Sequence, residues 1–103
     1  MLRLPPFTYH APTSVDEAVT RLAESPADSM VVAGGTDVVP NMKRRQWTPR
    51  HLVGLRNIVG LSGFRDCGSG DFEIGASTTL SAIVGNARLK TECLGVWQAA
   101  VQV

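Results

Sequence analysis

The sequence predicts an α+β fold, in which a small parallel sheet with helices is followed by an antiparallel segment. Three observations support this fold class. An amphipathic helical segment separates two extended segments, which is the order of a βαβ unit. The second extended segment, residues 29–33, is apolar on both faces, as parallel strands are. Beyond residue 61, the residues alternate on either side of a Gly-Ser-Gly-Asp turn at 68–71, which indicates a hairpin.

The first elements are an extended arm, a short strand and a helix. Two prolines at 5–6 favour an extended arm, and residues 7–12 alternate as a short strand does. Residues 13–26 contain the clearest helix, which Ser14 can cap and for which Glu17 can complete a capping box. A proline ends it. Its apolar stripe consists of Val15, Ala18, Val19, Leu22 and Ala23.

Strands and helices continue to alternate along the rest of the chain. Residues 36–45 follow two glycines and are expected to form a short helix, and residues 50–55 are expected to form a third strand. Residues 79–89 are expected to form a single helix that Thr78 or Thr79 caps, although a glycine interrupts its pattern. The apolar side of this helix consists of Leu80, Ile83 and Val84.

The character of the sequence changes near residue 58, so we expect two subdomains, residues 1–58 and 59–103. Residues 94–103 have the pattern of a helix still in progress at the last residue, because no glycine, proline or basic turn closes it. We therefore expect the second subdomain to be truncated. The apolar stripe of this last helix consists of Val96, Ala99, Ala100 and Val103.

Composition and charge exclude several classes of function. The 103 residues, 44% of them hydrophobic, suffice for one small core. A net charge of +1 predicts no general attraction to nucleic acid or membranes, and no apolar run is long enough for insertion into a bilayer. Cys67 and Cys93 are too few and too far apart for a disulfide framework or a metal site. This usage is typical of reduced thiols in a cytoplasmic protein.

Residues 31–37, Val-Val-Ala-Gly-Gly-Thr-Asp, place two glycines where a strand ends and a helix begins. Glycine permits a positive φ and lets another group approach the backbone. Free amides at a strand–turn–helix junction can bind an anion, to which Thr36 adds a hydroxyl. The spacing is neither that of a P-loop nor that of GxGxxG. The local pattern therefore suits either a phosphate site or a plain tight turn.

Other polar and aromatic residues have structural interpretations. Asp37 would repel a diphosphate, so we expect it to point away, capping the helix or binding a sugar hydroxyl. The basic run at residues 43–45 is expected to be a solvated helix end. His10 and His51 are expected to be single, unpaired residues at the surface or at strand ends. Both tryptophans are expected to pack against the fold.

Two motifs together resemble a known protein family. Residues 31–45, VVAGGTDVVPNMKRR, followed by residues 72–83, FEIGASTTLSAI, resemble the FAD-binding subunit of the molybdenum hydroxylases. That family includes xanthine dehydrogenase, carbon monoxide dehydrogenase and 4-hydroxybenzoyl-CoA reductase. Residues 7–24 also fit the first helix of the family. The form of the glycine motif looks closest to the medium subunits of the hydroxybenzoyl-CoA reductase and carbon monoxide dehydrogenase types.

The resemblance implies two α+β subdomains with FAD held between them, and a glycine loop whose amides wrap the FAD diphosphate. It implies electron transfer between FAD and iron–sulfur clusters of a small partner subunit, in a complex with a large molybdopterin-binding subunit. It assigns no catalytic or metal-ligating residue to this sequence. On this interpretation, a valine at Gly35 would fill the space of the diphosphate. The cofactor-binding residues it implies are Val32, Ala33, Gly34, Gly35, Thr36, Asp37 and Val38.

Two alternatives remain open. One is a non-enzymatic small α/β interaction module, which would contact its partner through residues 43–45 and Trp47. The other is a flavoprotein of the same broad fold with a different electron partner. The family also has a Thr-x-Gly-Gly motif on the other side of the flavin, and the sequence ends before it. We therefore expect the fragment alone to be inactive. Residues 74–76, which match a family strand, are assigned to packing.

Overall fold

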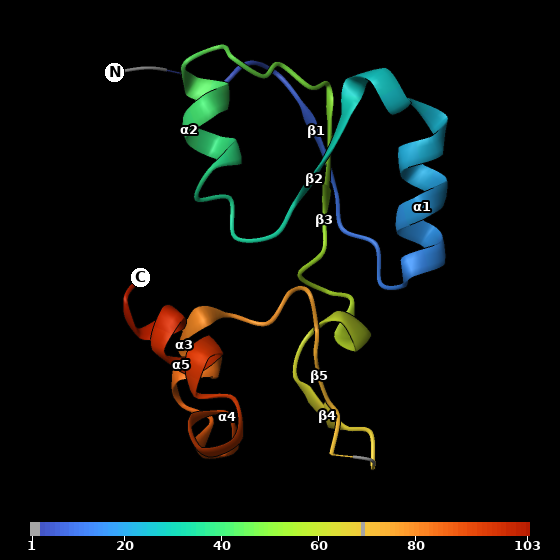
Figure 1. The fold of residues 1–103 in the computed structure, drawn as a ribbon. Helices are drawn as coiled ribbons and strands as arrows, with labels where there is room; N and C mark the ends of the chain where they lie inside the picture. Colours follow the sequence, from blue (N-terminus) through green and yellow to red (C-terminus); the bar gives the residue numbers. More distant parts are fainter. Residues whose placement is uncertain (1–2, 69) are drawn as a thin grey trace. The chain divides into compact units, whose positions relative to one another are not determined.

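The computed structural model describes residues 3–68 and 70–103. The chain divides into two compact units, a first that ends at Val59 and a second that runs Gly60–Val103 (Figure 1). The first unit contains a parallel sheet and the second an antiparallel pair of strands, as the α+β prediction requires. The assignment of these units to two flavin-binding subdomains stays a prediction.

The first unit is built on a three-stranded parallel sheet of order β1-β3-β2, which comprises β1 (Thr8–His10), β2 (Ser29–Val32) and β3 (His51–Gly54). Helix α1 (Val15–Glu24) and the 3-10 turn Pro26–Asp28 connect β1 to β2. Helix α2 (Val38–Lys43) connects β2 to β3. The two helices lie on opposite sides of the sheet (Figure 1). All five predicted elements of this unit are confirmed.

The core of the first unit lies between the sheet and α2. Val32, Met42 and Leu52 are buried together, and the Met42 side chain is fully buried. The opposite helix, α1, is packed more lightly. Of its predicted apolar stripe only Ala18 is buried, while Val15 and Val19 are half exposed. Helix α2 is therefore held firmly at the end of β2, which fixes the segment that joins them.

The N-terminus of α1 confirms one half of the predicted capping box and corrects the other. The Ser14 hydroxyl accepts a hydrogen bond from the Glu17 amide at 3.1 Å. The Glu17 carboxylate, however, accepts from the amide of Thr13 at 3.1 Å rather than from that of Ser14. The carboxylate thus reaches one residue further back than a capping box requires. Both contacts satisfy backbone amides that have no partner within the helix.

The two histidines correct another expectation, because they are paired. His10 Nε2 lies 3.1 Å from His51 Nδ1, and the ring centroids are 5.3 Å apart. The parallel register aligns His10 with Val53, two residues beyond His51. Residues two apart in a strand point to the same face, so the rings meet diagonally across β1 and β3. Sequence spacing gives no sign of such a pair.

The 3-10 turn Val59–Leu61 spans the boundary between the units, and the second unit continues with the hairpin of β4 (Phe64–Asp66) and β5 (Phe72–Ile74). Phe64 pairs with Ile74 in antiparallel register, which confirms the predicted hairpin. One residue of its turn, Ser69, lies outside the described residues. A Cβ at Gly75 would collide with the carbonyl of Leu61. This close approach supports a packing role for residues 74–76.

The single helix predicted over residues 79–89 is wrong, because the structure has two helices there: α3 (Leu80–Val84) and α4 (Ala87–Glu92). Thr79 caps α3 through the amide of Ala82. Gly85 ends α3, and the Asn86 side chain accepts from the Leu89 amide at 3.0 Å to begin α4. An asparagine satisfies the first amides of a helix well, so the Gly-Asn pair acts as a stop followed by a start.

The last helix, α5 (Leu94–Val101), ends two residues before the predicted stripe does. Within that stripe only Ala100 is buried, and Val103 is almost fully exposed. Trp97 is half-buried, and its indole N–H donates to the Val84 carbonyl at 2.8 Å. Both cysteines are free thiols. The three short helices of the second unit are therefore held together by few buried side chains.

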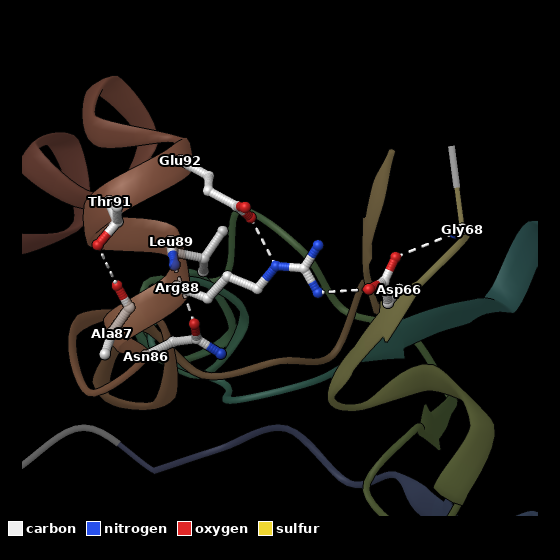
Figure 2. A network of polar contacts seen from close by, with 8 residues as sticks. All are labelled: Asp66, Gly68, Asn86, Ala87, Arg88, Leu89, Thr91 and Glu92. Carbon is white, nitrogen blue, oxygen red and sulfur yellow. Dashed lines mark hydrogen bonds and ion pairs between the residues drawn. The ribbon is translucent and has the colours of Figure 1, made fainter. Parts of the chain in front are cut away.

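A polar network joins α4 to the hairpin. Figure 2 shows the Arg88 side chain extending from α4 to Asp66 on β4, to which it donates at 2.7 Å, and to Glu92 on its own helix. Asp66 also accepts from the Gly68 amide at 3.0 Å. The guanidinium lies over the Phe72 ring, 4.8 Å from its centroid. The hydrogen bond from Arg88 holds the pKa of the Asp66 carboxyl below its usual value.

Candidate functional site

The candidate site is the segment that joins β2 to α2, residues 33–37, which we call the Gly-Gly loop. Its two ends are fixed. Val32 is buried in the core, and its carbonyl accepts from the Leu55 amide at 3.1 Å. Val38, the first residue of α2, packs against the same core. The loop itself is largely exposed, so a rigid frame presents it to solvent.

The two glycines of the loop serve different purposes. Gly35 has a φ of +77°, and a Cβ added there would lie 3.3 Å from Val39 and 3.7 Å from Val32. A side chain at Gly35 would therefore press on the protein's own valines. Gly34 has no atom within 4 Å of its missing Cβ. The expectation that a side chain at Gly35 would fill the ligand space stays a prediction, and the geometry adds that the open side of the loop belongs to Gly34.

The backbone amides of the loop are free to bind a ligand. Among the described residues, none of the six amides from Ala33 to Val38 donates a hydrogen bond. Within the part of the chain that the structure describes, two loop carbonyls accept backbone hydrogen bonds: that of Gly35 accepts from the Val39 amide, and that of Asp37 accepts from the Asn41 amide. Exposed amides in a row are the donors that oxyanions use at strand–helix junctions. The loop therefore fits a phosphate or diphosphate, as the glycine pair predicts.

The acidic residue of the loop is turned toward α2. Asp37 stands at the N-cap position, but its side chain makes no capping hydrogen bond, so the expected cap is wrong. Its carboxylate accepts instead from Asn41 Nδ2 at 3.0 Å, and the same amide group donates to the Asp37 carbonyl at 2.9 Å. Asn41 lies one turn along the helix. The Asp37 carboxylate is thus engaged with α2, as its expected orientation requires.

One residue at this end of the sheet escapes detection from sequence. A Cβ at Gly54 would collide with the phenol ring of Tyr9, so the Tyr9 ring lies directly over Gly54. Gly54 pairs with Val32, the residue from which the loop departs. The Tyr9 side chain is 51% exposed. The one signal in the sequence is Gly54, because a glycine within a strand often marks a place where another group closely approaches the backbone.

The basic run is separate from the loop. Lys43, Arg44 and Arg45 are exposed at the far end of α2, six residues and about 9 Å of helix from its start. This confirms the expected solvated helix end. Among the described residues no three His, Cys, Asp or Glu side chains cluster as metal ligands would. Within the same residues, no helix is both long enough and apolar enough to cross a membrane.

Comparison with proteins of known sequence identifies relatives of this chain. The chain is 45% identical over 80 residues to the carbon monoxide dehydrogenase medium chain of Afipia carboxidovorans, which covers 78% of this chain and 27% of that protein. It is 30% identical over 77 residues to the xanthine dehydrogenase FAD-binding subunit of Escherichia coli O157:H7, and this match covers 75% of this chain and 26% of that protein. The chain therefore spans about a quarter of the length of these curated relatives.

Solved structures give the same result for the fold. The carbon monoxide dehydrogenase of Oligotropha carboxidovorans matches with a TM-score of 0.92 at 37% identity, over 97% of this chain and 35% of that chain. The quinoline 2-oxidoreductase of Pseudomonas putida 86 matches with a TM-score of 0.89 at 27% identity, over 96% of this chain and 34% of that chain.

A family-level match completes the assignment. Residues 5–103 match the family described as the FAD binding domain in molybdopterin dehydrogenase. The match includes the Gly-Gly loop, the hairpin and all five helices. The chain belongs to the family of FAD-binding domains found in molybdopterin dehydrogenases.

Proposed function

We propose that the Gly-Gly loop holds the diphosphate of FAD, and that the protein contributes to a molybdopterin-dependent oxidoreductase. The observation that carries the proposal is the run of six unengaged amides from Ala33 to Val38 beside the open side of Gly34. Hydrogen bonds from backbone amides to an oxyanion are charge-assisted, so each is stronger than a neutral one. Val32 and Val38 act by fixing the two ends of the loop in the core.

The remaining loop residues support the same role. The Thr36 hydroxyl is exposed and, within the described residues, makes no hydrogen bond, so it can donate to a phosphate oxygen. Asp37 is held against Asn41, which limits its repulsion of a diphosphate. Gly35 supplies the positive φ that turns the chain from β2 into α2. None of these residues needs to act as an acid, base or nucleophile.

The cofactor supplies the redox chemistry and the protein supplies its position and surroundings. We infer that the protein passes electrons between FAD and iron–sulfur clusters on a small subunit, in a complex that also has a large molybdopterin-binding subunit. The relatives support this assembly, since two of them are a medium chain and an FAD-binding subunit. The free thiols suit a cytoplasmic location, which we propose on that ground.

FAD retention by loop variants tests the proposal in the native polypeptide that contains this sequence. Gly34→Val places a branched side chain on the open side of the loop and is expected to abolish FAD retention. Gly60→Val is the matched control, because Gly60 is also exposed with no atom within 4 Å of its missing Cβ. Equal FAD content in both purified variants would show that the diphosphate does not lie on the loop.

A further inference from the structure

The first unit has a second candidate site, at the end of the sheet opposite the Gly-Gly loop. It is a groove of about 550 Å³, which we call the arginine groove. Thr8 begins β1 and Arg50 precedes β3, whereas the Gly-Gly loop follows the last residue of β2. The strands are parallel, so Thr8 and Arg50 lie at the end of the sheet where the strands begin, and the Gly-Gly loop lies at the end where β2 finishes. Figure 1 shows these strands. The groove is lined by Pro5, Pro6, Phe7, Thr8, Arg45, Thr48 and Arg50.

The charge of the arginine groove is entirely positive. Arg45 and Arg50 line it, no carboxylate does, and neither arginine forms an ion pair among the described residues. Asp28 contacts Arg50 through the backbone, because the Asp28 carbonyl accepts a hydrogen bond from the Arg50 amide. Arg45 has a φ of +63°, a conformation that side chains other than glycine rarely adopt. The residues that line the groove therefore include two arginines and no counter-charge.

The backbone of the groove offers few donors. The amides of Thr8, Arg45 and Arg50 all donate to carbonyls of the protein, at 2.8–3.0 Å, and the two prolines have no amide hydrogen. The groove therefore differs from the Gly-Gly loop, where free amides suit a phosphate. Its charged donors are the guanidinium groups of Arg45 and Arg50, and guanidinium groups match carboxylates in planar, paired geometry.

The groove also has an apolar lining. Pro5 is buried, whereas Pro6 and Phe7 are exposed, so Pro6 and the ring of Phe7 supply the apolar surface along which an extended chain can lie. Apolar contact on one side and guanidinium groups on the other suit a peptide in which acidic and apolar residues alternate, because successive side chains of an extended chain point in opposite directions.

From this juxtaposition we infer that the arginine groove binds an acidic, extended segment of a partner protein. Arg45 and Arg50 pair with its carboxylates, and the proline arm with Phe7 covers its apolar side. The charge complementarity supports this occupant, and the volume exceeds what a single small anion fills. The inference is independent of the flavin site, since none of the seven lining residues belongs to the Gly-Gly loop.

The test measures binding of a fluorescein-labelled (Glu-Leu)₃ peptide to the native polypeptide by anisotropy, with (Gln-Leu)₃ as the neutral peptide. The double variant Arg45→Gln/Arg50→Gln is compared with Lys43→Gln/Arg44→Gln, which removes the same charge from exposed residues that do not line the groove. We expect the groove variant to weaken binding of the acidic peptide at least tenfold. The control variant should bind as the unmodified protein does.

Three results would overturn the inference. Equal weakening in both double variants would indicate general attraction to basic charge, and equal binding of the two peptides would exclude carboxylate recognition. The third result is displacement of the acidic peptide by inorganic phosphate at an ionic strength at which sodium chloride does not displace it. That result would indicate a site for free anions instead. Thermal unfolding of both variants checks that they are folded. FAD content, which the groove variant should retain, separates this test from that of the proposed function.

Discussion

Substitutions at the two adjacent glycines of the loop should have opposite consequences. In Gly34→Val the new side chain meets no protein atom within 4 Å of its Cβ, and the φ of Gly34 is not in the positive range. Surface substitutions without a special backbone or contact change stability by about 0.5 kcal/mol or less. We therefore expect the flavin-free Gly34→Val protein to unfold at nearly the unmodified temperature, while its FAD content falls at least tenfold.

Gly35→Ala should show the reverse. A residue with a Cβ at a φ of +77° costs about 1–2 kcal/mol, and the added atom would also lie 3.3 Å from Val39. These measurements use the native polypeptide that contains this sequence, and for a domain of about 150–250 residues each kcal/mol lowers the unfolding temperature by roughly 2–4 °C. The flavin-free protein should therefore unfold roughly 2–8 °C lower. At low temperature, where it remains folded, it should still retain FAD.

The assay combines thermal unfolding of the flavin-free proteins with FAD content measured by absorbance after release. Flavin-free protein is required because a bound ligand raises the unfolding temperature by itself. If Gly34→Val unfolded as early as Gly35→Ala, the open side of Gly34 would be refuted. If Gly35→Ala lost FAD at full stability, the division of roles between the two glycines would be wrong.

The remaining predictions concern the frame around the loop and the second unit. The hydrogen bond from Arg88, together with that from the Gly68 amide, lowers the pKa of Asp66 in the folded protein. The stabilisation by the ionised carboxylate is therefore fully present above the ordinary pKa of 3.8 and is lost as the pH falls through the lower pKa of the folded state. In urea titrations, the stability difference between the unmodified protein and Asp66→Asn should shrink as the pH is lowered below 3.8, and Arg88→Ala, which removes the largest cause of the shift, should weaken this pH dependence. Asn86→Ala removes the cap of α4 and should destabilise the second unit by about 1 kcal/mol, measured by urea unfolding, with Asn86→Ser largely restoring it. Gly54→Ala should displace the Tyr9 ring and expose its phenol further, which quenching of tyrosine fluorescence by acrylamide would detect.

Local sequence patterns predicted the elements that depend on neighbouring residues. The Ser14 cap, the hairpin turn and the helix after the glycine pair were all visible, because each depends on residue types within one turn. The break at Gly85 was visible but misjudged. A glycine inside an apolar helical pattern is often tolerated, and its outcome here depended on the asparagine that follows and begins a new helix.

Contacts across the fold could not be predicted from spacing. The pairing of His10 with His51 requires the parallel register of β1 and β3. The distinction between Gly34 and Gly35 requires the positions of two valines on different elements. In the loop, the glycine pair indicated where a ligand could approach the backbone. Which of the two glycines has an open side depended on the tertiary frame.

The strand order β1-β3-β2 also determines when the binding loop can take shape during protein synthesis. Neither β1 nor β2 has a neighbour until β3, the central strand, has left the ribosome, because these two strands pair only with β3. Val32 is synthesised 22 residues before its partner Gly54. At about 5–20 residues per second, this leaves the loop without its frame for roughly 1–4 s. If the loop holds the flavin diphosphate as proposed, capture of a flavin by the nascent chain must wait at least for the last strand of the first unit.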